Sequence, residues 1–173
     1  MTGNLAIFDP DAPARILAAA QDETDWGIAW CLLKEGMHPT QIVRLSGKNL
    51  HGDWLTWKRV KNERPREAFV PKDDQTRLLA FLENHKPTRK TMWLRVIAMS
   101  RRAGYDATPR ELRKTAILGW IREYRGRQDM MALVAARAGC SQDTVARYYL
   151  SLTQWEAAGS PTERRSPPPQ RTP

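Results

Sequence analysis

Apolar residues recur at helical spacing along most of this chain and alternate with polar residues over one short stretch. Leu78, Leu79 and Leu82 illustrate the helical spacing, because residues three and four positions apart share one face of a helix. The predicted helices span residues 13–20, 26–35, 75–84 and 91–103, with a short one after His38, one that begins at Pro109 and two that flank Gly139. The polar residues 22–25 are predicted to separate the first two helices.

The alternating stretch predicts a β-hairpin. Residues 54, 56, 58 and 60 would face one side of a strand, and residues 55, 57 and 59 the other. Residues 62–65 have the composition of a turn, and residues 66–70 read as a second strand that Pro71 ends. The expected fold class is therefore mainly α with a small antiparallel β-hairpin or three-stranded sheet, an α+β fold.

The helix that begins at Pro109 carries the first candidate chemistry. Thr108 is a plausible N-cap, proline suits the first helical position, and Glu111 stands three residues after the cap, as in a capping box. Arg110 and Arg113 share one face of this helix because they are three residues apart. Tyr148 and Tyr149 follow in a later helix. Two arginines and a tyrosine on neighbouring helices suggest chemistry on a phosphate.

Charge points to the same kind of partner. The chain has 173 residues and a formal net charge of +9, with a pI near 10.0. Such a balance favours an anionic partner, of which nucleic acid is the most common, although basic residues also serve solubility alone. Cys31 and Cys140 lie far apart, and no CxxC motif or histidine cluster accompanies them. We therefore expect no disulfide, no metal site and no cofactor.

The sequence shows no apolar run long enough to span a membrane and no signal peptide. We expect no membrane partner and a cytoplasmic, nucleoid-associated protein. Residues 1–12 are expected to be an extended lead-in, residues 13–158 one domain, and the basic, proline-rich residues 159–173 a disordered tail.

Two motifs resemble the tyrosine recombinase (phage integrase) family. The segment PRELRKT is similar to the family's H-x-x-R block, with Arg113 on the arginine and Arg110 in place of the histidine. The segment AGCSQDTVARYY is similar to the block that ends on the nucleophilic tyrosine. Cys140 stands in that block's histidine position, and the family spacing of about nine residues leads to Tyr149.

The resemblance extends upstream. GMHPTQIVRL is similar to the turn and short helix that carry the family's first catalytic arginine, and His38 stands at that position. KNERPREAFVP is similar to the family's hairpin motif, which puts Lys61 at the catalytic lysine, with Lys58 as second choice. Ordinary solvated charges in a hairpin turn would look the same. The resemblance implies a catalytic domain without the helical DNA-clamp domain that usually precedes it.

The resemblance also implies roles for these residues. Tyr149 would attack a DNA phosphate and form a 3′-phosphotyrosyl link, with Arg113, Arg110 and His38 on the phosphate and Lys61 as proton donor to the leaving 5′ oxygen. For Cys140 the simpler alternative is a small buried residue at a turn, and for Tyr149 a packing role.

Further basic residues are expected to contact the DNA. The hairpin contributes Lys58, Arg59, Arg64 and Arg66, the break between helices contributes Arg125 and Arg127, and the last helix contributes Arg147. The expected partner is double-stranded DNA, with self-association on it as a dimer or tetramer. The expected process is DNA integration or site-specific recombination in a mobile element.

Two other functions agree with the same sequence. Residues 130–152 resemble a helix-turn-helix unit, which would suit a DNA-binding regulator without catalysis. The chain could also be a degenerate recombinase that serves as a structural partner of an active subunit. A hairpin at 53–71 with Lys61 facing Arg113 would favour the recombinase, whereas a wholly helical chain would favour the regulator.

Overall fold

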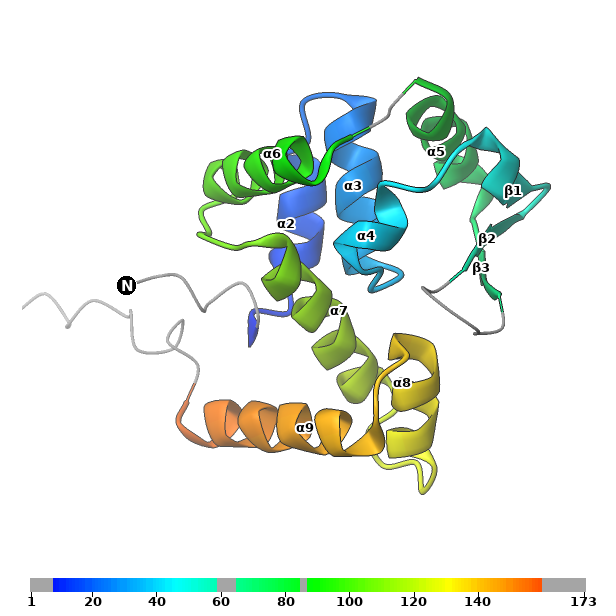
Figure 1. The fold of residues 1–173 in the computed structure, drawn as a ribbon. Helices are drawn as coiled ribbons and strands as arrows, with labels where there is room; N and C mark the ends of the chain where they lie inside the picture. Colours follow the sequence, from blue (N-terminus) through cyan, green and yellow to red (C-terminus); the bar gives the residue numbers. More distant parts are fainter. Residues whose placement is uncertain (1–7, 59–64, 85–86, 160–173) are drawn as a thin grey trace, which may run out of the picture.

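The structure is a computed structural model that describes residues 8–58, 65–84 and 87–159. Helices dominate it, and a small sheet lies at one side (Figure 1). The helices are α2 (Ala12–Ala18), α3 (Glu23–Leu33), α4 (Pro39–Ile42), α5 (Lys72–Asn84), α6 (Arg89–Arg102), α7 (Pro109–Glu123), α8 (Met130–Ala138) and α9 (Gln142–Ala157), with a short 3-10 helix at Gly47–Asn49.

The sheet has three antiparallel strands in the order β1 (Leu50–His51), β2 (Trp54–Trp57) and β3 (Arg66–Phe69). β2 and β3 form the expected hairpin, with Trp54 opposite Phe69 and Trp57 opposite Arg66. The alternation also holds, because Leu55 and Trp57 are buried whereas Trp54 is exposed. The predicted fold class, mainly α with a small three-stranded antiparallel sheet, is confirmed.

Helix α3 forms the centre of the larger core. It contacts α2, α5, α6 and α7 (Figure 1), and nine of its 11 residues are buried. A helix buried on nearly all sides needs apolar residues all round, and the run WGIAWCLL supplies them. A second core lies where the C-terminal half of α7 meets α8 and α9, around Ile121, Val134 and Leu152. Helix α7 contributes to both cores and joins them.

The polar break predicted at residues 22–25 is wrong. These residues start α3: Asp22 is its N-cap and accepts a hydrogen bond from the Asp25 amide at 2.7 Å. Asp25 is buried, and its carboxylate pairs with Arg95 and Arg102 of α6, each at 2.7 Å. Acidic residues are favourable in a first helical turn because they face the positive end of the helix dipole. The pattern of polar residues was therefore a helix start and not a gap.

Other helix boundaries differ from the prediction by a few residues. Helix α5, predicted over residues 75–84, begins at Lys72, so Asp73 and Asp74 lie in its first turn. Helix α6 begins at Arg89, because Thr88 and Thr91 form a capping box there. Helix α7 begins as predicted, with Thr108 and Glu111 as its capping box. Within the described residues, no helix is both long and apolar enough to cross a lipid bilayer.

The N-terminal end of the described chain contacts both cores. Phe8 stacks on Trp155 of α9 with ring centroids 5.5 Å apart, and the Arg122 side chain donates to the Phe8 carbonyl. The Tyr105 hydroxyl donates to Asp9 at 2.6 Å. Residues 8–12, expected as part of an extended lead-in, thus pack on the domain. The tail expected at 159–173 lies, except for Gly159, outside the described residues.

Candidate functional site

Arg113 is held at a junction of three segments. Its Nε donates to the Gly36 carbonyl oxygen at 2.8 Å, and one terminal nitrogen donates to the Ala138 carbonyl oxygen at 3.0 Å. Gly36 ends the segment after α3 with a positive φ, and Ala138 is the last residue of α8. The half-buried guanidinium therefore fixes α7 to both segments, and these contacts also fix its orientation.

His38 lies next to Arg113 and is the N-cap of α4. Its Nδ1 accepts from the Thr40 amide at 3.3 Å and lies 2.8 Å from the Thr40 hydroxyl. An accepting Nδ1 carries no proton, so we assign the imidazole proton to Nε2. Desolvation, followed by the positive charges of Arg113 and Arg89, lowers the pKa of His38. His38 is therefore a neutral hydrogen-bond donor near pH 7 when no anion is bound.

Two cavities adjoin His38 and Arg113, and both residues line each of them. The first, which we name the Arg66 cavity, has a volume of about 330 Å³ and includes Glu35, Arg66 and Gly139 in its wall. The second, which we name the Trp93 cavity, has a volume of about 250 Å³ and includes Arg89, Trp93 and Arg110. The elements α4, α6 and α7 meet at the Trp93 cavity, and the hairpin and α8 meet α4 at the Arg66 cavity.

Arg110 lies one helical turn before Arg113 and is exposed. Its side chain makes no hydrogen bond or ion pair with any residue that the structure describes, and neither does the side chain of Arg89. The structure thus brings His38, Arg110 and Arg113, three of the residues expected at the site, to one cavity. Such a group of donors and positive charges can bind an anion such as a phosphate.

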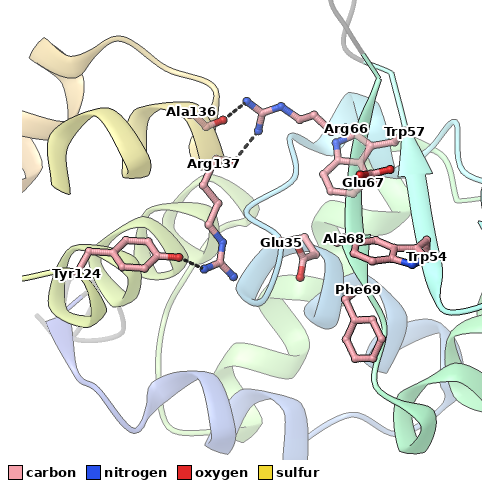
Figure 2. Close-up of a pocket in the computed structure, with 10 residues that line it drawn as sticks. All are labelled: Glu35, Trp54, Trp57, Arg66, Glu67, Ala68, Phe69, Tyr124, Ala136 and Arg137. Atoms are coloured by element: carbon pink, nitrogen blue, oxygen red, sulfur yellow. Dashed lines mark hydrogen bonds between the residues drawn. The ribbon is translucent and has the colours of Figure 1, made fainter. Parts of the chain in front are cut away.

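Arg66 has a structural role that the sequence did not indicate. Figure 2 shows its side chain extending from β3 to the end of α8, where it donates to the carbonyl oxygens of Ala136 and Arg137. These carbonyls have no intrahelical partner, so a cationic donor stabilises the helix end. The hairpin is thereby attached to α8. Arg66, expected to contact DNA, also lines the Arg66 cavity.

Glu35 is an acidic residue that the sequence analysis missed. It is half-buried between the Arg66 cavity and the cavity drawn in Figure 2, which also includes Trp54, Phe69 and Arg137. Burial raises the pKa of its carboxyl, and the charges of Arg137 and Lys34 act in the opposite direction. Its position at the end of a buried helix was the available signal.

Cys140 and Tyr149 belong to the second core. Gly139 adopts the left-handed conformation that ends α8, and Cys140 follows it, half-buried. Tyr149 is also half-buried and packs against the same core. Among the described residues that line the Arg66 and Trp93 cavities, neither Cys140 nor Tyr149 is present. The structure thus groups His38, Arg110 and Arg113 at one cavity, whereas Tyr149 packs against the second core.

The remaining basic candidates are dispersed. Arg125 pairs with Glu156 at 2.8 Å, and Arg127 pairs with Asp129 at 3.0 Å. Lys58 and Arg147 are exposed and have no such partner among the described residues. Arg59, Lys61 and Arg64 lie in the hairpin connection, outside the described residues. In the part of the chain that the structure describes, no group of three or more His, Cys, Asp or Glu side chains could hold a metal ion.

Two residues of the Trp93 cavity were missed in the sequence. Arg89 and Trp93 belong to the first turns of α6, whereas the helix predicted over residues 91–103 left Arg89 outside it. A tryptophan four residues after an arginine at a helix start was the local signal. Only the approach of α6 to α4 and α7 reveals its relation to His38 and Arg110.

Comparisons with known proteins identify the fold. No family model matches the chain, and no curated protein matches it either. Among solved structures, the chain is similar to the crystal structure of XerA recombinase, with a TM-score of 0.67 and 16% sequence identity. The match covers 87% of this chain and 62% of the XerA chain. The chain therefore has a tyrosine recombinase-like fold, and at this identity the likeness concerns the fold alone.

Proposed function

We propose that this protein binds double-stranded DNA and breaks and rejoins its strands in integration or site-specific recombination. The observation that carries the proposal is the grouping of His38, Arg110 and Arg113 at one cavity of a recombinase-like fold. Such a protein would act on cytoplasmic, nucleoid DNA and would associate with further copies of itself there, as a dimer or tetramer.

The proposed phosphate site would stabilise charge without a metal. Arg113 is already oriented by its carbonyl contacts, and Arg110 adds a permanent positive charge one turn away. His38 offers one N–H donor in place of the two parallel donors of an arginine. Groups fixed in advance around a phosphate stabilise the negative charge that its oxygens gather in the transition state.

The proposed reaction has two steps. The Tyr149 oxygen attacks the phosphorus and its hydroxyl proton passes to solvent, a new bond forms between oxygen and phosphorus, and the bond to the 5′ oxygen breaks. Lys61 supplies the proton that the leaving 5′ oxygen takes up. A second 5′ hydroxyl then attacks the phosphotyrosyl link and its proton returns to the lysine, while the released tyrosine oxygen takes up a proton from solvent. Because one phosphodiester replaces another, no external energy source is needed.

The position of Tyr149 sets a requirement on this mechanism. Tyr149 packs on the second core and lines neither cavity beside Arg113. Catalysis therefore requires α9 to shift when DNA binds, or the tyrosine of another copy to enter the site. Helix α9 is held by few fully buried residues, since Val145 and Leu152 are the two of its residues that are buried.

The same observation favours a second candidate function, DNA binding without cleavage. A half-buried tyrosine packed on the second core and a histidine in the place of an arginine both suit a protein that holds DNA without cutting it. The hairpin at β2–β3 makes the wholly helical regulator less suitable. A degenerate subunit that assists an active recombinase is the remaining form of this candidate.

A nicked-duplex assay tests the two candidates. Duplexes from the flanks of the protein's own gene are incubated with the wild type, Tyr149→Phe and Tyr148→Phe. The neighbouring tyrosine is the matched control, since it is also half-buried on α9. A covalent adduct that survives SDS, persists in Tyr148→Phe and is lost in Tyr149→Phe would establish the strand-transfer reaction.

The opposite results are equally clear. Salt-sensitive binding without an adduct in any protein would establish the non-cleaving candidate. An adduct that survives in Tyr149→Phe and is lost in Tyr148→Phe would move the nucleophile to Tyr148. Absence of DNA binding by the wild type would refute both candidates.

A further inference from the structure

Trp93 is an exposed aromatic residue in a basic environment. Its side chain is 45% exposed, although it lies on a helix whose other face is buried in the core. An exposed tryptophan offers a large flat face on which another ring can stack. Trp93 lines the cavity that His38, Arg110 and Arg113 also line, so that contact would be made beside the proposed phosphate site.

The walls of the Trp93 cavity combine flat apolar surface with positive charge. Met92, Pro39 and Pro109 supply apolar surface, and Met92 is 1% exposed, so this wall is fixed in the core. The charged and titratable side chains in the wall are His38, Arg89, Arg110 and Arg113. No carboxylate occurs among the described residues that line it. A ligand with a flat ring and a negative charge matches both properties.

Two arginines of the rim have no acidic partner among the described residues. Arg89 and Arg110 are exposed and form no ion pair with any described residue. By contrast, Arg101, in the last turn of α6, pairs with Asp106, and Arg77 on α5 pairs with Glu23. The unpaired arginines of α6 and α7 therefore face the same cavity from two helices.

We propose that the Trp93 cavity binds an unpaired nucleotide of a DNA strand, with the base stacked on Trp93 and its phosphate on Arg89 and Arg110. This inference rests on the proposed DNA-binding function and adds a substrate feature to it. An aromatic side chain beside arginines is a common platform for single-stranded nucleic acid, because every base has a flat face that can stack. The preferred substrate is thus a duplex in which one base lies outside the stack.

The test compares two fluorescent duplexes of equal length, one fully paired and one with a single unpaired nucleotide. Their binding is measured by anisotropy with the whole chain. The wild type is expected to prefer the duplex with the unpaired nucleotide. Trp93→Ala is expected to bind that duplex about tenfold more weakly and the paired duplex as before, since it loses one base stack. Trp93→Phe is expected to restore most of the preference.

Trp54→Ala is the matched control, because Trp54 is 46% exposed and lies on the sheet, away from this cavity. It is expected to leave both affinities unchanged. The inference is overturned if the wild type has no preference, if Trp93→Ala weakens both duplexes equally, or if Trp54→Ala abolishes the preference as well.

A competition experiment distinguishes a nucleotide within a DNA strand from a free nucleotide as the ligand of the cavity. Deoxycytidine monophosphate is added as a competitor at millimolar concentration. Weak or no competition supports the strand as the source of the nucleotide, whereas complete competition would contradict it. Equal, salt-sensitive binding of both duplexes by the wild type refutes the inference about the cavity and leaves the proposed DNA binding intact. If the wild type binds neither duplex, the proposed function itself is refuted.

Discussion

Arg113 illustrates how one residue can serve both structure and a site. Its side chain donates to the carbonyl oxygens of Gly36 and Ala138, which belong to segments far apart in the sequence. Loss of catalysis or binding in an Arg113 variant therefore does not identify a contact with DNA unless stability is measured as well. Arg110, on the same face but exposed, has no such structural contacts among the described residues.

Arg113→Ala is expected to lower the free energy of unfolding by about 2–3 kcal/mol, because two buried carbonyl oxygens lose a charged donor. Arg110→Ala, the matched control on the same helix, should change it by less than about 0.5 kcal/mol. Urea denaturation of the two variants measures the difference. Equal stability of both variants would contradict the structural role given to Arg113.

His38 makes stability depend on pH. Desolvation and the charges of Arg113 and Arg89 lower its pKa in the folded protein, so the unfolded chain binds more protons between the folded pKa and the ordinary value of about 6.5. The His38 contribution to stability is therefore fully present above about pH 6.5 and is lost as pH falls towards the folded pKa.

His38→Asn tests this dependence. Asparagine keeps a side-chain acceptor at the N-cap of α4 but does not titrate. The wild type is expected to lose more stability than the variant between about pH 7.5 and pH 5. Comparing the two proteins cancels the contributions that other titrating groups make to the pH dependence of stability. Glu35 is one of these groups, and its raised pKa changes stability in the opposite direction. Identical losses in the two proteins, measured by urea denaturation, would contradict the assignment.

At the scale of elements, the contact between α3 and α5 requires a glycine. A Cβ at Gly27 of α3 would lie 2.2 Å from the Phe81 ring of α5, which no real contact allows. The two helices approach closely because position 27 has no side chain. The sequence shows Gly27 inside an apolar helix, but only the packing of α5 explains it.

Gly27→Ala is expected to destabilise the protein by about 1–3 kcal/mol, as overpacked cores do. Gly119→Ala is the matched control, since Gly119 is also helical but a Cβ there meets nothing within 4 Å. The control should be stabilising by about 0.5–1 kcal/mol, because alanine favours the helix. Thermal unfolding measures the change in stability of each variant. Destabilisation by both substitutions would contradict the packing argument.

At the scale of the whole molecule, charge and fold determine how DNA would be held. The net charge of +9 alone provides non-specific attraction to DNA. The position of each basic residue decides whether it would contact DNA. Two arginines at opposite ends of α6 allow a comparison. Arg89 lies at the Trp93 cavity, whereas Arg101 lies near the other end and pairs with Asp106.

Arg89→Ala and Arg101→Ala remove the same charge and thus separate position from net charge. Arg89→Ala is expected to lower the slope of log affinity against log salt by about 1, because one phosphate contact is lost. Arg101→Ala should leave the slope within error. The measurement is a salt titration of duplex binding, and equal effects of the two variants would show that only the net charge matters.

The sequence by itself determined the helices, the hairpin and the fold class. Local signals fix these: the capping box at Thr108 and Glu111 starts α7, and alternation from Trp54 places β2. It missed the start of α3, since the acidic residues of a first helical turn resemble a polar linker. The resemblance of its motifs to the recombinase family also selected His38, Arg110 and Arg113, which the fold brings to one cavity.

Only the tertiary structure decided which of these residues meet. It placed Arg89 and Trp93 beside His38 and attached Arg66 to α8, because the packing of α6 and of the hairpin depends on contacts far apart in the sequence. It also placed Tyr149 on the second core and outside the lining of the Arg66 and Trp93 cavities. Helical spacing fixes the face on which a residue lies, whereas the packing of helices decides what that face contacts.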